Sequence, residues 1–176
     1  LGISVQQVYG TTEYSGAVSF WKESQNKSKY TSLGKPVMHG HVEIIDIVTG
    51  NLCGANEIGE IVVSGPQVFL GYYKNEEGTS ETLQNGRLYT GDLGYFDNDG
   101  FLYVVDRLKD VIIYGSDRIY SSEVERILLE HPLIDEVAVI GVPNNEFGEI
   151  PKAIVVKKLG SRLTAEDVKS FCIEKL

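Results

Sequence analysis

The chain has 176 residues, of which 42% are hydrophobic and 23% charged, proportions that fit a globular protein rather than a disordered or fibrous one. Its formal net charge of -9 argues against a broad basic surface, so we expect no nucleic acid among its partners. No apolar run approaches the roughly 20 residues that span a bilayer, and the first residues lack the pattern of a signal peptide, so we expect a cytoplasmic protein without a transmembrane segment.

The first part of the chain consists of short β-type segments separated by turns. Apolar and β-branched residues predict strands at 5–8, 42–47 and 60–63, and the first strand should end in a loop at 9–13. A hairpin is predicted at 87–105, with its turn at 97–100. The acidic residues of this turn superficially resemble a calcium loop, but the ligand positions are out of register and a plain turn is expected.

After residues 106–110 the pattern changes to strands that alternate with helices, and we place a domain boundary there. Strands are predicted at 111–114, 137–142 and 153–156, the last two in a buried sheet because their apolar runs are nearly continuous. Ser122 and Glu125 have the spacing of a capping box for a helix that Pro132 ends, and Thr164 caps a last helix. These elements predict an α+β fold, β-rich in its first part.

Familiar phosphate-binding patterns are missing from the sequence. It contains neither a G-x-x-x-x-G-K-[ST] run nor a Rossmann fingerprint. Cys53 and Cys172 form no C-x-x-C pair, so they are expected to be ordinary reduced thiols. Candidate binding residues are therefore isolated aromatic and charged side chains.

Four such side chains each have a functional and a structural interpretation. Tyr9 could stack on a purine or pack half-buried, and Glu13 could bind Mg²⁺ or be merely solvated. Asp92 could accept hydrogen bonds from both hydroxyls of a ribose or bond its own turn. Arg107 could hold the sugar or pair with a neighbouring aspartate. Taken singly, none of the four decides between the two interpretations.

Several short motifs, however, follow one another in a specific order. They are Tyr-Gly-Thr-Thr-Glu at 9–13, Gly-Glu-Ile at 59–61 with Gly-Pro at 65–66 and Gly-Tyr-Tyr at 71–73, Thr-Gly-Asp at 90–92, Arg-Leu-Lys-Asp at 107–110, and Ile-Tyr-Ser-Ser-Glu-Val-Glu at 119–125. This ordered set resembles the ANL adenylate-forming superfamily, named for acyl-CoA synthetases, peptide-synthetase adenylation domains and luciferases. The resemblance runs through nearly the whole chain.

The resemblance implies a role in nucleotide binding for the residues of the first motifs. Tyr9 would stack on adenine, with Gly10 in the same nucleotide-binding segment, and Thr12 would contact the α-phosphate. Glu13 would hold Mg²⁺, and Asp92 would bind the ribose hydroxyls.

The resemblance implies that the later motifs contact the ribose, form the hinge and approach coenzyme A. Arg107 would assist at the ribose, and Lys109 falls at the hinge about which the family's small domain swings between its two half-reactions. The segment with Gly115 and Ser116 would approach the channel for coenzyme A. Ser116 stands where many relatives have the second glycine of a pair, and Ile113 where they often have lysine, so a side chain could obstruct the close approach there.

The implied reaction joins a carboxylic acid, expected to be a fatty acid, to coenzyme A with consumption of ATP. The carboxylate attacks the α-phosphorus, pyrophosphate leaves, and the thiol of coenzyme A takes the acyl group from the adenylate. Residues 1–108 would be the C-terminal portion of the large AMP-binding domain, and 109–176 a truncated small C-terminal domain. The family's phosphate loop would lie upstream and its adenylating lysine beyond Leu176, so no catalytic residue is expected within this chain, which alone should make no acyl-adenylate.

Two other interpretations stay open at this point. The acyl group could pass to another acceptor, such as a carrier protein or, as in luciferases, oxygen. Alternatively, the chain could be a non-catalytic binding module on the same scaffold. Binding of AMP that depends on Tyr9 and Asp92 would separate a nucleotide site from a mere scaffold.

Overall fold

The computed structural model describes residues 3–175 and divides into two compact units. The first unit extends to Val105, and the second begins at Asp106. None of the helices described in this range has the length and apolarity that a membrane crossing needs.

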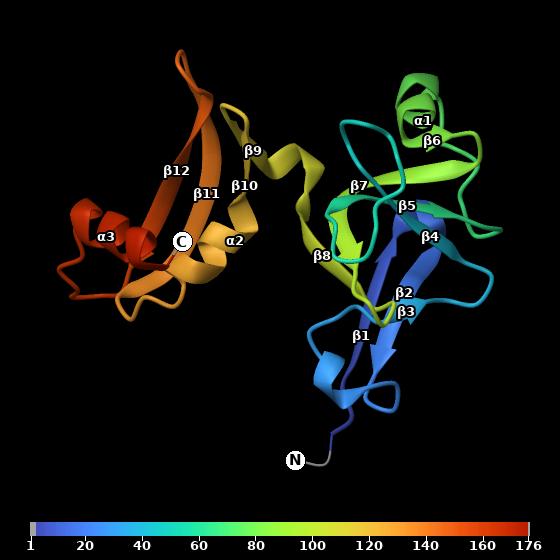
Figure 1. The fold of residues 1–176 in the computed structure, drawn as a ribbon, viewed down its shortest axis with the longest axis horizontal. Helices are drawn as coiled ribbons and strands as arrows, with labels where there is room; N and C mark the ends of the chain where they lie inside the picture. The colour runs from blue at the N-terminus through green and yellow to red at the C-terminus, as the bar shows by residue number, and fades with distance from the viewer. Residues whose placement is uncertain (1–2, 176) are drawn as a thin grey trace. The chain divides into compact units, whose positions relative to one another are not determined.

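The first unit begins with a small antiparallel sheet (Figure 1). It contains β1 (Gln6–Thr11), β2 (Gly16–Lys22) and β3 (Lys35–Pro36) in that order. The short 3-10 helices η1 (Thr12–Tyr14) and η2 (Lys27–Lys29) lie in its connections. The register of β1 against β2 shifts after Tyr9, which pairs with Ser19, whereas Gly10 pairs with Ala17.

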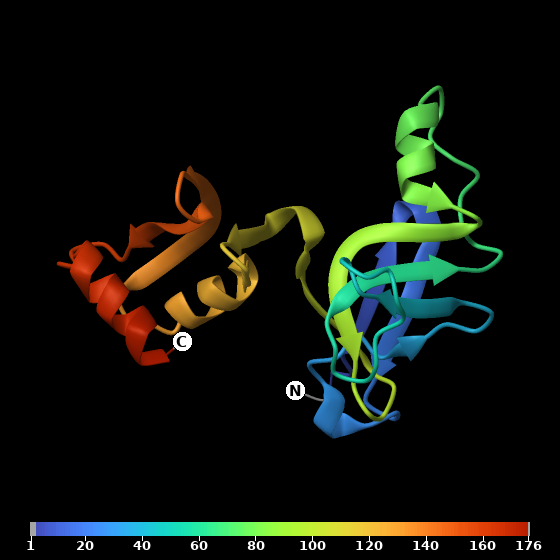
Figure 2. The same ribbon diagram turned by 45° about the horizontal axis from the view of Figure 1, so that its top comes forward.

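The second sheet of this unit is formed by the following strands. They are β4 (His41–Ile45), β5 (Gly59–Ser64), β6 (Leu83–Gln84), β7 (Arg87–Phe96) and β8 (Leu102–Arg107), in the order β4-β5-β7-β6 with β8 also paired to β7. Figure 2 shows α1 (Glu76–Thr82) at the end of this sheet where β6 lies. The predicted hairpin at 87–105 is therefore confirmed, whereas no helix was predicted at the position of α1.

The two sheets of the first unit share one apolar core. Tyr14 and Val18 from the first sheet and its connection pack with Ile61, Leu88 and Leu102 from the second, and all five are nearly inaccessible to solvent. Because this core joins segments from both ends of the unit, it fixes β1 relative to β7. That relationship positions the candidate site.

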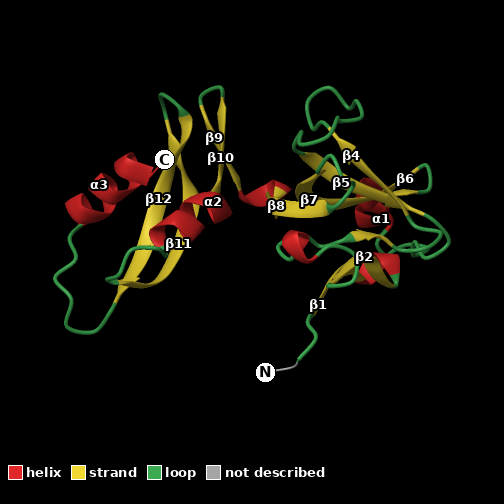
Figure 3. Ribbon diagram, turned by 60° about the horizontal axis from the view of Figure 1, so that its bottom comes forward, coloured by secondary structure: helices red, strands yellow, loops and turns green. Residues whose placement is uncertain are grey.

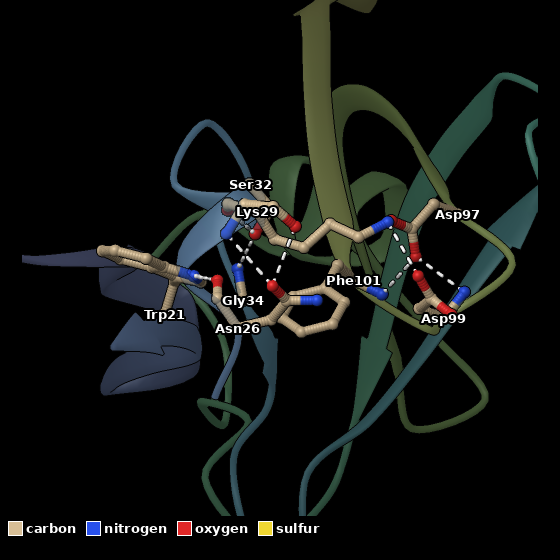
Figure 4. Close-up of polar contacts among 9 residues, drawn as sticks. Trp21, Asn26, Lys29, Ser32, Gly34, Asp97, Asp99 and Phe101 are labelled. Carbon is tan, nitrogen blue, oxygen red and sulfur yellow. Dashed lines mark hydrogen bonds and ion pairs between the residues drawn. The ribbon is translucent and has the colours of Figure 1, made fainter. Parts of the chain in front are cut away.

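A partly buried ion pair ties the connection after β2 to the turn between β7 and β8 (Figure 4). Lys29 Nζ lies 2.6 Å from Asp97 Oδ2 and 2.8 Å from Asp99 Oδ2. Asp97 also accepts hydrogen bonds from the amides of Asp99 and Phe101, both at 2.9 Å. Burial raises the pKa of Asp97, but the hydrogen bond from Lys29 and those from the two amides outweigh it, and the net shift of the pKa is downward.

The second unit is an antiparallel sheet with two helices. After η3 (Leu108–Asp110) come β9 (Val111–Tyr114), β10 (Asp117–Tyr120), α2 (Ser121–Leu128), β11 (Ile134–Asn144), β12 (Gly148–Lys157) and α3 (Ala165–Lys175), with the strands in the order β10-β9-β12-β11. Figure 3 shows α2 and α3 beside the long β11–β12 hairpin. The core of this unit is Ile112, Leu128, Ile134 and Val139, with α3 residues packed against it.

The α+β fold class is confirmed, and three local predictions are wrong. Residues 9–11 lie in strand β1 rather than in a loop, because they pair with β2. The β11–β12 hairpin is not a buried sheet, since Ile140, Ile154 and Val156 are between 44% and 51% exposed. The capping box at α2 is also wrong, because Ser122 N–H donates to Asp106 and Glu125 accepts from the amide of Val139.

The cap of α3 is confirmed. Thr164 Oγ1 accepts from the amide of Asp167 at 3.2 Å, and the Asp167 carboxylate accepts from the amide of Thr164 at 2.9 Å. Which domains of a larger protein the two units represent stays a prediction.

Candidate functional site

The predicted site residues Tyr9 and Asp92 meet in the first unit. The hydroxyl of Tyr9 on β1 donates a hydrogen bond of 2.7 Å to Asp92 Oδ2 on β7. Tyr9 is 9% exposed and Asp92 7% exposed, so the bond is largely shielded from solvent. Two motifs that are 83 positions apart thus form one local structure.

Asp92 lies in a bulge of β7. In the pairing of β5 with β7, Glu60 lies opposite Leu93 and Val62 opposite Tyr89. Residues 90–92 on β7 therefore face a single residue of β5. Such an insertion interrupts the ladder and redirects the side chains of the bulged strand.

Side chains replace the ladder hydrogen bonds that this bulge loses. The amide of Gly91, which has a φ of +71°, donates to Glu60 Oε1 at 3.0 Å. The hydroxyl of Thr90 donates to the carbonyl of Ile61 at 2.7 Å and accepts from the amide of Asp92 at 3.1 Å. The Thr-Gly-Asp motif is thus a hydrogen-bonded unit that holds the Asp92 backbone in place.

Glu60 has an unusual environment for a carboxylate. Burial raises its pKa above the ordinary value, and the nearby charge of Asp92 adds to this effect. The hydrogen bond from Gly91 opposes both by favouring the charged form. Glu60 belongs to the Gly-Glu-Ile motif at 59–61, and no role was predicted for it from the sequence.

Gly10 is required by the close approach of two backbone segments. A Cβ at this position would lie 2.1 Å from the carbonyl oxygen of Gly16. No side chain fits at that distance, because real carbon–oxygen contacts are more than 3 Å long. The glycine therefore allows β1 to shift register directly after Tyr9.

The turn after Gly10 borders an open depression of about 670 Å³. Thr11 caps η1 by accepting from the amide of Tyr14 at 3.2 Å, and the exposed Thr12 is the first residue of η1. The lining of the depression comes from β1, η1 and β2 and consists of Val8, Gly10, Thr11, Thr12, Ser15, Gly16 and Ala17. Thr12, which was predicted to contact phosphate, thus lies in a concave part of the surface.

Glu13 is held by the segment that carries the Gly-Tyr-Tyr motif. The hydroxyl of Tyr72 donates to Glu13 Oε1 at 2.7 Å, and the amide of Phe69 donates to the Glu13 carbonyl at 2.7 Å. The hydrogen bond to Glu13, together with burial, raises the pKa of Tyr72. Its neighbour Tyr73 is 87% exposed, so only the first tyrosine of the Gly-Tyr-Tyr motif touches the site.

Arg107 and Lys109 belong to the second unit. Arg107 ends β8, and its amide donates to its neighbour Asp106 at 2.8 Å, while Lys109 lies exposed in η3. The contact of Arg107 with a ribose and the hinge role of Lys109 stay predictions.

Asp106 organises the start of α2. Its Oδ2 accepts from the hydroxyl of Ser121 at 3.1 Å and from the amide of Ser122 at 3.0 Å. The residue directly before the helix, Tyr120, makes no side-chain capping bond. The aspartate at the end of β8 therefore caps a helix that begins 15 positions later.

Gly115 and Ser116 form the exposed turn between β9 and β10. Gly115 has a φ of +60°, and its amide donates to the carbonyl of Phe147 at 2.8 Å. Ser116 is not among the residues with positive φ, so serine causes no backbone strain there. Approach of coenzyme A to this turn stays a prediction.

No group of three or more possible metal ligands occurs among residues 3–175. Both cysteines are free, and burial raises the pKa of each thiol, which favours the unreactive neutral form. A closed structural metal site in the described part of the chain therefore has no ligand set to support it.

Comparison with known proteins gives consistent matches. A family model described as AMP-binding enzyme matches residues 1–73, and one described as AMP-binding enzyme C-terminal domain matches residues 123–176. YdaB of Bacillus subtilis (strain 168), whose name describes an acyl-CoA ligase, is 47% identical over 176 residues, which are 100% of this chain and 35% of YdaB.

Solved structures match over the same length. The o-succinylbenzoate CoA synthetase MenE from Bacillus subtilis, in complex with the acyl-adenylate intermediate OSB-AMP, has a TM-score of 0.88 and 39% identity over 99% of this chain and 35% of that chain. MenE in complex with ATP and a magnesium ion has a TM-score of 0.86 and 39% identity over 99% of this chain and 36% of that chain. The chain thus spans about a third of the length of the relatives it matches.

Proposed function

Because this chain belongs to the ANL superfamily of AMP-binding enzymes, we propose that it is part of an AMP-forming ligase that joins a carboxylic acid to coenzyme A. In the first half-reaction the carboxylate would attack the α-phosphorus of ATP and release pyrophosphate. In the second, the thiol of coenzyme A would displace AMP from the acyl-adenylate. The contact between Tyr9 and Asp92 is the observation that carries the proposal, because it joins the two motifs assigned to adenosine.

The proposed binding of adenosine uses the carboxylate of Asp92 and the ring of Tyr9. An ionised carboxylate has two oxygens with several lone pairs, so Asp92 can accept from Tyr9 and from ribose hydroxyls together. The hydroxyl of Tyr9 fixes its ring relative to Asp92, so adenine and ribose would be bound in a fixed relative geometry. Such positioning lowers the barrier to reaction by restricting the reactants in advance.

Glu13 and Thr12 are the proposed phosphate end of this site. Mg²⁺ is usually held by one or two carboxylates together with phosphate oxygens and water, and the half-exposed carboxylate of Glu13 fits this requirement. When bound, Mg²⁺ would neutralise phosphate charge. Tyr72 would hold the Glu13 side chain in place, and the exposed Thr12 would donate its hydroxyl to a phosphate oxygen.

The second unit would supply the parts that act between the half-reactions. Arg107 would assist at the ribose, Lys109 would serve as the hinge, and Gly115 and Ser116 would lie near coenzyme A. The exposed β9–β10 turn carries no strain at Ser116, which supports a normal second half-reaction despite the missing glycine.

The acid is the least constrained part of the proposal. The sequence led us to expect a fatty acid, but the names of the relatives give that expectation no particular support, since MenE is a synthetase for o-succinylbenzoate. We therefore propose that the substrate is a carboxylic acid, and that aromatic dicarboxylates are candidates for it as well as fatty acids. A cytoplasmic location remains part of the proposal.

A substrate screen on the intact ligase that contains this chain tests the proposed activity. Pyrophosphate release would be measured with ATP, Mg²⁺ and a panel of aromatic, short-chain and fatty acids, with coenzyme A present and absent. The proposal predicts acid-dependent pyrophosphate release and a thioester product only with coenzyme A. Adenylate formation without any thioester would point to a different acyl acceptor, and no acid-dependent release would contradict the proposal.

A further inference from the structure

We propose that Glu60 is a positioning residue for nucleotide binding, because its carboxylate holds the 90–92 bulge in the conformation that presents Asp92 to the ribose. The inference rests on the function proposed for Asp92. It assigns a role to a half-buried carboxylate outside the set of residues expected to touch the nucleotide.

The bulge needs an acceptor that β5 cannot offer from its backbone. Since residues 90–92 face one residue of β5, the amide of Gly91 has no ladder partner opposite it. Glu60 is the last regularly paired residue before the bulge, and its side chain reaches this amide with an N···O distance of 3.0 Å. The carboxylate therefore replaces a missing backbone acceptor.

Loss of this acceptor would favour a regular ladder in place of the bulge. The bulge adds two residues to β7, so a regular ladder would move Asp92 by two positions, roughly 6–7 Å along the strand. The 2.7 Å hydrogen bond from Tyr9 to Asp92 requires the present position of Asp92 along β7. The conformation of the bulge and the position of the candidate ribose ligand are thus coupled through Glu60.

The charges around Glu60 indicate that a carboxylate is not the most stable choice at this position. From β7 it faces the Gly91 amide and the acidic Asp92, and from β4 its cross-strand partner is the apolar Ile45. Burial and the like charge of Asp92 both raise the pKa of Glu60. A neutral residue would avoid the free-energy cost of a half-buried charge beside Asp92. A charged acceptor, however, makes the stronger hydrogen bond to an amide.

A dependence of binding on pH follows from this arrangement. As the pH falls through the raised pKa of Glu60, the carboxylate becomes neutral and its bond to Gly91 weakens. Binding of the nucleoside should weaken in parallel. Glu60→Gln keeps an acceptor oxygen but cannot titrate, so it should remove this part of the pH dependence.

The experiment titrates adenosine into the ¹⁵N-labelled 176-residue chain between about pH 4.5 and 7.5, followed by NMR. Adenosine is the probe because it lacks the phosphate, which itself titrates near pH 6. The variants are Glu60→Gln, Glu60→Ala and Asp92→Ala. The Gly91 amide reports directly on the contact with Glu60, whether or not adenosine is present.

In the wild type the Gly91 amide shift should titrate with a midpoint above the ordinary pKa of glutamate, and this titration should be absent in Glu60→Gln. At neutral pH, Glu60→Ala should weaken adenosine binding about tenfold and Glu60→Gln about threefold or less. The affinities of wild type and Glu60→Gln should converge at acid pH. If Glu60 only stabilised the fold, the adenosine affinities of wild type and Glu60→Gln would not become equal at acid pH.

The outcomes distinguish an error in the role of Glu60 from an error in the adenosine site itself. If Asp92→Ala weakens binding and Glu60→Ala does not, the role of Glu60 is wrong and the adenosine site stands. If neither variant changes binding, or the wild type binds no adenosine, the function proposed for this site fails and the role of Glu60 in it fails as well. A Gly91 amide that ignores pH in the wild type would overturn the contact itself.

Discussion

The hydroxyl of Tyr9 lies 2.7 Å from Oδ2 of Asp92, and both residues are less than a tenth exposed. The contact connects β1 with β7 and so combines the register shift of β1 and the Thr-Gly-Asp bulge of β7 into one site. The register shift of β1 and the bulge of β7 each depend on one residue. Gly10 permits the first, and Glu60 satisfies the second.

Tyr9→Phe should reduce the free energy of unfolding by about 1–2 kcal/mol, because it removes a shielded hydrogen bond to a carboxylate. Urea denaturation of the chain measures this change. Tyr73→Phe is the matched control, since Tyr73 is 87% exposed, and it should leave the unfolding free energy unchanged within about 0.5 kcal/mol. Equal effects of the two substitutions would contradict the importance of the contact.

Gly10→Ala should destabilise the chain by about 2–3 kcal/mol, because the added methyl group meets the carbonyl oxygen of Gly16 at 2.1 Å. Gly54→Ala is the control, since a Cβ there meets nothing closer than the flexible Glu57 side chain at 3.3 Å. Thermal unfolding of both variants tests the difference. A Gly10→Ala variant as stable as the control would show that β1 and β2 can separate at no cost.

Lys29→Met should lower the urea midpoint at neutral pH, because it removes the ion pairs with Asp97 and Asp99 (Figure 4). The pKa of Asp97 is lowered in the folded chain, so its contribution to stability is present at neutral pH and is lost as the pH falls from about 3.9 through the folded value. The difference between wild type and variant should therefore shrink in acid. Lys27→Met, at a site whose side chain is 83% exposed, should show no such difference at any pH.

Asp106→Ala should destabilise the second unit by about 1 kcal/mol, because Asp106 accepts from the amide of Ser122 at the start of α2. Hydrogen exchange should become faster at the first amides of α2. Asp110→Ala, which replaces an exposed aspartate in the same segment, is the control. Unchanged exchange at Ser122 would mean that the helix start does not depend on Asp106.

The sequence was sufficient to predict the features whose partners are close along the chain. The hairpin at 87–105 and the cap at Thr164 depend on alternation and on contacts within three or four positions, and both were predicted. The candidate residues Tyr9 and Asp92 were chosen by resemblance, and the structure brings them together. Their roles in binding remain proposals.

The features that the sequence did not predict depend on distant partners. Glu60 and Gly91 are 31 positions apart, and Tyr72 and Glu13 are 59 positions apart, so no local pattern pairs them. The cap of α2 was assigned to Ser122 and Glu125 because their spacing fits a capping box. The fold instead brings Asp106 to that helix end, and the Glu125 carboxylate accepts from the amide of Val139.

The most direct test of the central claim is a calorimetric titration of AMP into the chain and into two variants at neutral pH. Asp92→Ala should weaken AMP binding by about tenfold to a hundredfold, because it removes the hydrogen bonds of a charged acceptor. Asp135→Ala, at an exposed position of the second unit, should bind AMP as the wild type does. Equal AMP affinity in the wild type and Asp92→Ala would contradict the adenosine site.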